Sequence, residues 1–168
     1  MKPRAFPILF ATVGALATLT ACADKILEHP VTTTPPAPFT VTFTGGQITA
    51  AIAASGTARS TGLKGRHSMA ADSGMLFVFV SDQPVPPSLF AVGFYMDSTF
   101  LDLSIAFLDS TKTVISLDEM LATTLTIHYP PRPYRYALEA NKGWFTSHGV
   151  LPGAAASFAL PAGTIISP

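Results

Sequence analysis

Several carboxylates in the second half of the chain could act as general acids or bases. The candidates are Asp97, Asp102, Asp118, Glu119 and Glu139. Glycoside hydrolysis requires two carboxyl groups at a fixed separation, one as acid and one as base or nucleophile. No motif fixes such a separation here, and Glu139 falls in an expected strand, where an ion pair with Arg59 or Arg66 is the alternative. A hydrolase would use Asp97, Asp102 or Glu139 as its acid or base.

Neither a nucleophile nor a metal site is indicated by a sequence motif. The chain has no Gly-x-Ser-x-Gly elbow and no Gly-rich phosphate loop, and its one cysteine is Cys22. The histidines lack the close paired spacing that zinc ligands show. They are His29, His67, His128 and His148. We therefore expect no metal and no cofactor, and the sequence favours a binding protein over an enzyme.

The stretch from His128 to Tyr136 carries three tyrosines and two arginines on a proline-rich backbone. Aromatic faces stack on sugar rings, and arginine binds carboxylate or phosphate. Together with residues elsewhere, the stretch gives a candidate ligand-binding surface. Its members are Arg59, Arg66, Tyr95, Asp97, Tyr134, Arg135 and Trp144. The alternative is that the tyrosines cover the fold and that Trp144 packs in the core.

The N-terminal segment has the features of an export signal. A basic start precedes an apolar run from Ala5 to Leu19, which is shorter than the about 20 residues of a membrane-spanning helix. The Leu-Thr-Ala-Cys sequence ending at Cys22 resembles the lipobox of bacterial lipoproteins. The resemblance implies that residues 1–21 are a signal peptide. It also implies that Cys22 is acylated and anchors the chain to a membrane.

This signal implies an exported protein, lipid-anchored to the cell envelope. The membrane would be the outer membrane in a Gram-negative host and the plasma membrane otherwise. Residues 22–38 are rich in proline and threonine and predict an extended tether. With its only thiol acylated, the mature chain has no disulfide, so a packed core must stabilise residues 39–168.

Composition argues against nucleic acid as a partner. Beyond residue 21 the chain has 8 basic and 10 acidic side chains, whereas nucleic-acid-binding domains are strongly basic. The length from 39 to 168 suits one domain.

Residues 39–168 predict a mostly β, α+β fold with two short helices, compact and barrel-like. The apolar run from Met75 to Val80 has no polar face, which is typical of a central buried strand. The other expected strands are 40–44, 47–54, 90–96, 103–108, 113–117, 134–140 and 157–160. The expected helices are 57–63 and 142–148, the second with Asn141 as N-cap and Gly149 just past its end.

Four segments, preceded by Arg59, match one family in order and spacing. They are Gly62–Arg66, Asp72–Phe79, Ile105–Asp109 and Leu138–Trp144. Over roughly Ile48 to Leu160 the chain thereby resembles domain-of-unknown-function family 192 of bacteria and archaea. The resemblance implies a small, single-domain, β-rich, barrel-like fold. Members are often exported or lipid-anchored, and the family has no established activity.

The chain departs from the family pattern at several polar positions. Lys64 replaces a methionine, Asp97 replaces a lysine, and Ser98 replaces an asparagine. Tyr95 stands where the family usually has tryptophan, and Ser104 where it usually has aspartate. The altered polar set is compatible with a new specificity or with a lost function.

The sequence therefore predicts a cell-envelope lipoprotein carrying a small β-rich binding module. Its ligand would be an envelope glycan or a partner protein. The alternatives are a small carbohydrate-active hydrolase of the envelope and a structural or assembly factor.

Overall fold

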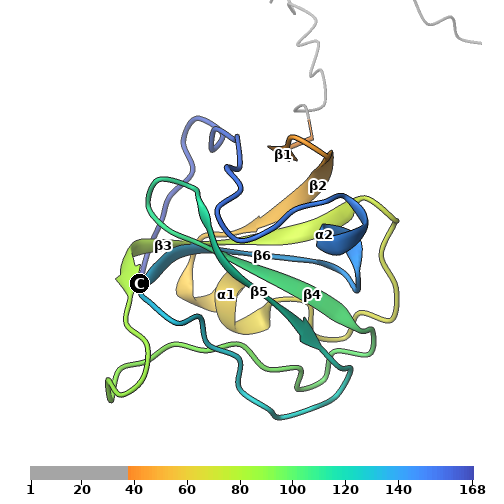
Figure 1. Ribbon diagram of the computed structural model, residues 1–168. Helices are drawn as coiled ribbons and strands as arrows, with labels where there is room; N and C mark the ends of the chain where they lie inside the picture. The colour runs from red at the N-terminus through yellow and green to blue at the C-terminus, as the bar shows by residue number, and fades with distance from the viewer. Residues whose placement is uncertain (1–37) are drawn as a thin grey trace, which may run out of the picture. The chain divides into compact units, whose positions relative to one another are not determined.

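Residues 38–168 are described by a computed structural model, and they build one six-stranded sheet with two short helices (Figure 1). The strands are β1 (Thr40–Phe43), β2 (Gly46–Ala53), β3 (Ser73–Gln83), β4 (Leu103–Leu108), β5 (Val114–Met120) and β6 (Tyr134–Asn141). The helices are α1 (Gly56–Thr61) and α2 (Trp144–Ser147). The predicted mostly β, single-domain fold with two short helices is confirmed. The predicted signal peptide, Cys22 and the tether up to residue 37 lie outside the described residues.

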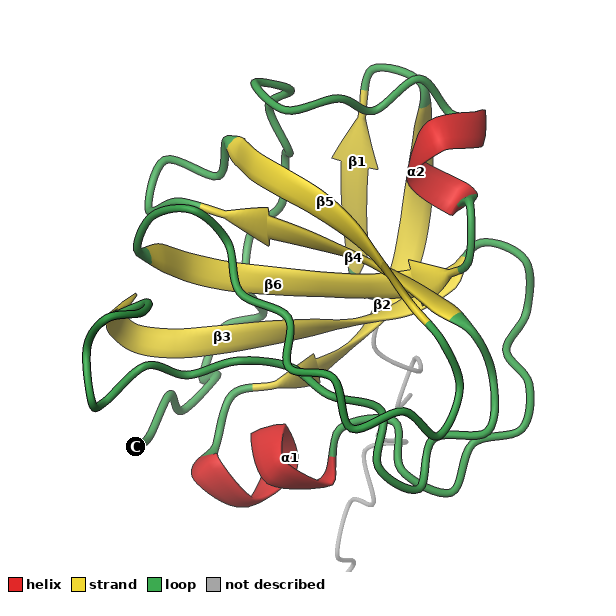
Figure 2. Ribbon diagram, turned by 60° about the horizontal axis from the view of Figure 1, so that its bottom comes forward, coloured by secondary structure: helices red, strands yellow, loops and turns green. Residues whose placement is uncertain are grey.

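The strand order is β1-β2-β3-β6-β4-β5. β2 and β3 are parallel, with α1 in the connection between them, and every other pair is antiparallel. Figure 2 shows the two helices on opposite sides of the strands. Neither helix in the described range is long and apolar enough to cross a membrane.

The sheet stays open, so the barrel is incomplete. Its two edge strands are β1 and β5. A single later segment makes isolated bridges next to both edges, Thr42 to Ser157 and Thr113 to Ala155. This segment therefore partly covers the two edges without closing the sheet.

Alternation along the central strands separates two apolar clusters, one on each face. The first core contains Leu76 and Val78 of β3 and is covered by α2 and the segment near Phe158. The second core contains Phe77 and Phe79 and is covered by the loop that carries Phe94 and Met96. Because β3 is buried on both faces, the prediction of a central buried strand is confirmed.

Two expected strands are wrong. Residues 90–96 make only one isolated bridge, from Phe94 to His128, and residues 157–160 make only the bridge at Ser157. Phe94 and Met96 are buried all the same, since they lie over the second core as a loop. The alternating apolar pattern of residues 90–96 therefore indicates a loop that packs onto the sheet, and not a strand that belongs to it.

The helix ends differ in part from the expectation. Ser55 caps α1 by accepting the Ala58 N–H at 3.1 Å, and Gly62 ends this helix with φ of 49°. The expected N-cap of α2, Asn141, is wrong: it belongs to β6, and its side-chain amide donates to the Ala70 and Ala71 carbonyls. Gly143 in the left-handed conformation precedes α2 instead.

We expect Phe77→Ala to lower the free energy of unfolding by about 3–5 kcal/mol. Phe77 is only 3% exposed, so truncation removes a large buried side chain and leaves a cavity. Denaturant unfolding would measure the change. Val80→Ala on the same strand is the control, because Val80 is 54% exposed. Equal losses for both variants would contradict this assignment of the buried face.

Candidate ligand-binding site

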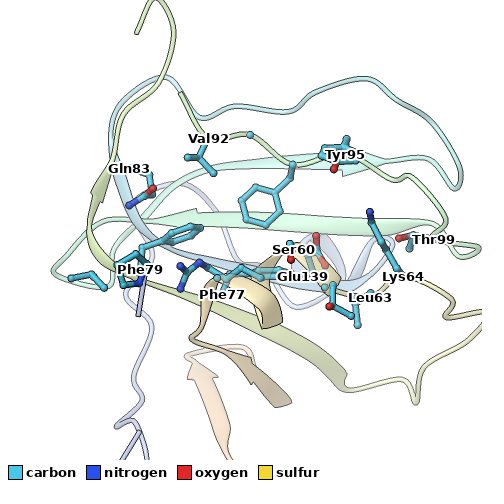
Figure 3. A pocket seen from close by; sticks show the side chains of 18 of the residues that line it. Ser60, Leu63, Lys64, Phe77, Phe79, Gln83, Val92, Tyr95, Thr99 and Glu139 are labelled. Carbon is cyan, nitrogen blue, oxygen red and sulfur yellow. The ribbon is translucent and has the colours of Figure 1, made fainter. Parts of the chain in front are cut away.

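A cavity of about 670 Å³ opens between α1, β3 and the loop that follows Val92 (Figure 3). Its apolar wall is formed mainly by Leu63, Phe77, Phe79, Phe94 and Tyr95. Its polar lining side chains are Arg59, Ser60, Thr61, Lys64, Ser81, Gln83, Thr99 and Glu139. A volume of this size matches the range of small-molecule sites, which are mostly apolar with a few placed polar groups.

Glu139 lies in the middle of this lining, with Phe77 and Phe79 to one side and Lys64 and Thr99 to the other (Figure 3). On β6, Leu138 and Ala140 belong to the first core, so alternation turns Glu139 toward the second core. Its side chain has no hydrogen-bond or ion-pair partner among the described residues, and the residue is 5% exposed.

Burial sets the protonation state of this carboxyl. Desolvation raises the pKa of Glu139 from 4.5 to about 8, because an apolar environment disfavours the charged form. The residues opposite it in the two ladders are Met75 and Ile105, both apolar. At neutral pH the pocket therefore contains a protonated carboxylic acid, which has one O–H to donate.

Edge-to-face aromatic contacts fix the apolar wall. The Phe77 and Phe94 rings meet with centroids 4.9 Å apart at 88°, and Phe79 meets Tyr134 at 5.4 Å and 85°. Such contacts stabilise beyond the area they bury. The wall is therefore a packed surface that persists without a ligand.

Arg59 lines the pocket but acts mainly as a structural cation. Its guanidinium donates to the carbonyls of Ala54 at 2.8 Å, Val78 at 3.0 Å and Ser167 at 2.7 Å. It also lies over the Phe79 ring, 5.0 Å from the centroid. The alternative expectation that Glu139 pairs with Arg59 or Arg66 is wrong, because no such ion pair exists among residues 38–168.

Four of the departures from the family pattern contact one another beside the pocket, and two of them, Lys64 and Tyr95, line it. Lys64 pairs with Asp97 at 3.2 Å, and its ammonium lies 5.6 Å from the centre of the Tyr95 ring. Ser98 donates to the Asp97 carboxylate at 3.3 Å. The replacements at these positions are therefore mutually compatible and form one interacting group.

Two members of the predicted ligand-binding surface are buried instead. Tyr134 is fully buried in the second core, and its hydroxyl donates to the Val92 carbonyl at 2.9 Å; burial raises the pKa of this phenol. Trp144 is buried in the first core, where its indole N–H donates to Asp72 at 2.8 Å. The expectation that both rings present a face to a ligand is wrong, and the core-packing alternative holds for Trp144.

The other predicted surface residues divide between the pocket and the rest of the domain. Arg59 and Tyr95 line the pocket. Asp97 lies next to it, because it pairs with Lys64, which does line the pocket. Arg135 pairs instead with Asp82 at 2.8 Å. Arg66 is exposed and borders a separate cavity of about 270 Å³. The structure therefore brings together three of the seven residues.

The sequence interpretation missed the aromatic wall and assigned Glu139 the wrong partner. One signal could have placed Glu139: it is the only acidic residue in any of the strands expected from the sequence. In a strand buried on both faces, such a residue must lie inside the domain. Phe77 and Phe79 were assigned to the core, but nothing in their spacing indicates an open cavity over them.

The remaining carboxylates lack the features of a catalytic pair. Asp102 accepts the Ala122 N–H at 2.8 Å and pairs with Lys142, and both interactions lower the pKa of this carboxyl. Asp118 contacts His128 Nδ1 at 2.6 Å, which resembles the acid and base of a hydrolase triad. Within the described range no hydroxyl or thiol hydrogen-bonds to His128.

Metal binding finds no support in the same range. No three His, Cys, Asp or Glu side chains of residues 38–168 gather closely enough to hold a metal ion. Among the side chains only one carboxyl, that of Glu139, lines the larger cavity in the described range. Glycoside hydrolysis needs a second.

We expect the free energy of unfolding to fall as the pH rises from about 5 to about 8. Above its ordinary pKa of 4.5 the carboxyl of Glu139 ionises in the unfolded chain, whereas the folded chain keeps it protonated up to about pH 8. The slope from this group approaches about 1.4 kcal/mol per pH unit. In Glu139→Gln this part of the slope should vanish. Denaturant unfolding at several pH values tests it, and identical slopes in both proteins would contradict the buried, uncharged carboxyl.

Two solved structures share this fold. One is a crystal structure from Sinorhizobium meliloti 1021, provisionally assigned as a transcription regulator; it is 28% identical, with a TM-score of 0.63 over 71% of this chain and 91% of that one. The other is a protein of unknown function from Novosphingobium aromaticivorans DSM 12444. It is 23% identical, with a TM-score of 0.63 over 72% of this chain and 84% of that one.

Comparison with curated proteins gave no match. The family comparison did: residues 39–158 match the family described as "uncharacterized ACR", which is domain of unknown function 192. The match spans all six strands and both helices of the domain. The chain therefore belongs to domain-of-unknown-function family 192.

Proposed function

We propose that this chain is a lipid-anchored protein of the cell envelope whose folded domain is a non-catalytic binding module. The observation that carries the proposal is the open, mostly apolar cavity beside α1 with one buried, unpartnered carboxyl inside it. A cavity left open over a packed aromatic wall does not contribute to the packing of the domain. Its combination of a broad apolar surface and few polar groups is typical of a ligand site.

The shape and lining of the cavity favour a small apolar ligand over a glycan. A sugar would need many hydrogen-bonding partners, because its hydroxyl groups lose water on binding. The stretch 128–136, on which glycan recognition was predicted, does not offer them: Tyr134 is buried and Arg135 is paired with Asp82. A small molecule with a ring-sized apolar body matches the wall of Phe77, Phe79 and Phe94 better.

The envelope location rests on the sequence alone. The lipobox-like sequence ends at Cys22, and about 15 residues of Pro/Thr-rich chain follow it. At about 3 Å per residue, an extended tether of this length would hold the domain roughly 45 Å or less from the lipid. The binding site would then sample the space next to the membrane.

A role in binding nucleic acid is not favoured, although one structural relative is provisionally assigned as a transcription regulator. Residues 38–168 contain seven basic and eight acidic side chains. Four of these cations, Lys64, Arg132, Arg135 and Lys142, already pair with aspartates. A phosphate backbone requires an excess of free cations on one face.

We expect Cys22→Ser to release the protein from the membrane. Acyl chains bound through the thiol supply about 0.8 kcal/mol per buried methylene, and the serine variant would lack them. Fractionation of cells that express each form, followed by immunoblotting, measures the change. A serine variant that stays in the membrane pellet would contradict lipid anchoring and leave the binding proposal untouched.

We expect a bulky side chain on the pocket side of α1 to block binding. Ser60 lines the cavity and is exposed, so Ser60→Trp should fill the entrance without disturbing the core. The matched control is Thr57→Trp, which is exposed on the same helix but does not line the cavity. The probe is 2-acetylnaphthalene, and calorimetric titration measures its dissociation constant.

Binding to the parent protein and to Thr57→Trp, with at least a tenfold loss in Ser60→Trp, is the expected result. A bound ligand at 100 times its Kd also adds about 2.7 kcal/mol to stability, which thermal unfolding detects independently. Equal binding by both tryptophan variants would place the site elsewhere. No binding to the parent protein by this probe or its hydrocarbon analogue would sink the proposal.

A further inference from the structure

The charged and acidic side chains around the cavity offer hydrogen-bond donors. Arg59 and Lys64 can only donate, and a protonated Glu139 has an O–H to donate. The Ser60 hydroxyl already donates to the Thr57 carbonyl at 3.0 Å. A ligand that satisfies the Glu139 O–H must therefore bring an acceptor.

Glu139 is one of the lining groups whose side-chain hydrogen-bonding capacity is unused, together with the hydroxyls of Thr61, Ser81 and Thr99. The Arg59 guanidinium bonds three backbone carbonyls, and the Lys64 ammonium pairs with Asp97. The Glu139 carboxyl has no protein partner in the described range, and its oxygens remain accessible from the cavity, because no fully buried side-chain N or O atom there lacks a hydrogen bond. A ligand oxygen beside this carboxyl would therefore find a free hydrogen-bonding partner.

We propose that the pocket selects ligands that carry a carbonyl-type oxygen on a ring-sized apolar body, and that the Glu139 carboxyl donates a hydrogen bond to this oxygen. The inference rests on the proposed function, since it names the ligand class of the same site. The aromatic wall receives the apolar body, and Glu139 sets the orientation. The aromatic wall is not specific for polar groups, so Glu139 supplies the discrimination between ligands of the same shape.

The opposite chemistry, an amine held by an ionised Glu139, conflicts with the other charges that face the cavity. Arg59 on α1 and Lys64 just beyond it are both cations. The strand neighbours of Glu139, Met75 and Ile105, are apolar. At the pocket edge, Pro168 contributes an oxygen that already accepts the Gly56 N–H at 3.1 Å.

Three naphthalenes of nearly equal shape separate these possibilities. 2-Acetylnaphthalene carries a carbonyl oxygen, 2-isopropylnaphthalene replaces this oxygen by a methyl group, and 2-(1-aminoethyl)naphthalene replaces it by an ammonium. The protein is the chain from residue 22 onward with Cys22→Ser, so that the probes do not partition into lipid or detergent. Calorimetric titration at pH 7 should give a Kd for the acetyl compound about tenfold below that of the isopropyl compound. The amine should bind most weakly of the three.

Two variants at position 139 assign the preference to the carboxyl. Glu139→Gln keeps a donor of similar shape, so it should retain the preference for the acetyl compound. Glu139→Leu removes the donor, so both naphthalenes should bind with similar Kd. In the parent protein the preference should fade above about pH 8, as the carboxyl ionises, while in Glu139→Gln it should stay constant from about pH 6 to about pH 9.

The outcomes also distinguish this inference from the proposed function. If none of the three probes binds, the ligand-binding proposal itself fails. If the isopropyl compound binds as tightly as the acetyl compound, or if the amine binds most tightly at pH 7, the cavity is a site but the role given to Glu139 is wrong. A preference that survives in Glu139→Leu would likewise overturn the assignment.

Discussion

The pocket depends on one guanidinium that joins three parts of the chain. α1 has six residues and none of them is fully buried, and of its apolar side chains only Ala58 packs against the second core, so its length and hydrophobic packing hold it weakly. Arg59 supplies the anchor, because it donates to the end of β2 at Ala54, to β3 at Val78 and to the C-terminal segment at Ser167. The wall that α1 contributes to the cavity therefore depends on these three hydrogen bonds.

The second constraint is the central position of β6, which pairs with β3 and β4 along its length. A side chain in the middle of this strand cannot move away from the interior, because the register fixes its direction. Gly74 illustrates how close the neighbouring chain lies: a Cβ there would collide with the backbone oxygen of Glu139. The acid is thus kept in an environment that opposes its charge, a destabilising arrangement of the kind that binding and catalytic sites retain.

The local sequence pattern was sufficient to predict most strands of the sheet, but it predicted few features of the candidate site. The unbroken apolar run of β3 predicted a strand buried on both faces, and Gly62 and Gly149 predicted helix ends, because each of these signals acts over a few residues. Residues 90–96 were predicted wrongly because an alternating loop over a core and a strand have the same pattern. The partners of Arg59 and Tyr134 lie 42 to 108 residues away in the most distant cases, so composition and spacing could not identify them. The family resemblance supplied the fold, but it could not indicate that Lys64 and Asp97 compensate each other.

The late segment that bridges both sheet edges has a consequence for how the protein is made. Ser157 exchanges two hydrogen bonds with Thr42 on β1, Ala154 bonds Val114 on β5, and Ser167 bonds Ala54 at the end of β2. These contacts join the beginning of the domain to its last residues, and such long-range closure is slow to form. A chain still emerging during synthesis lacks the segment and cannot complete its sheet edges. Under the proposed export, in which the chain crosses a membrane unfolded, this order of assembly would delay the native state until the segment itself has crossed.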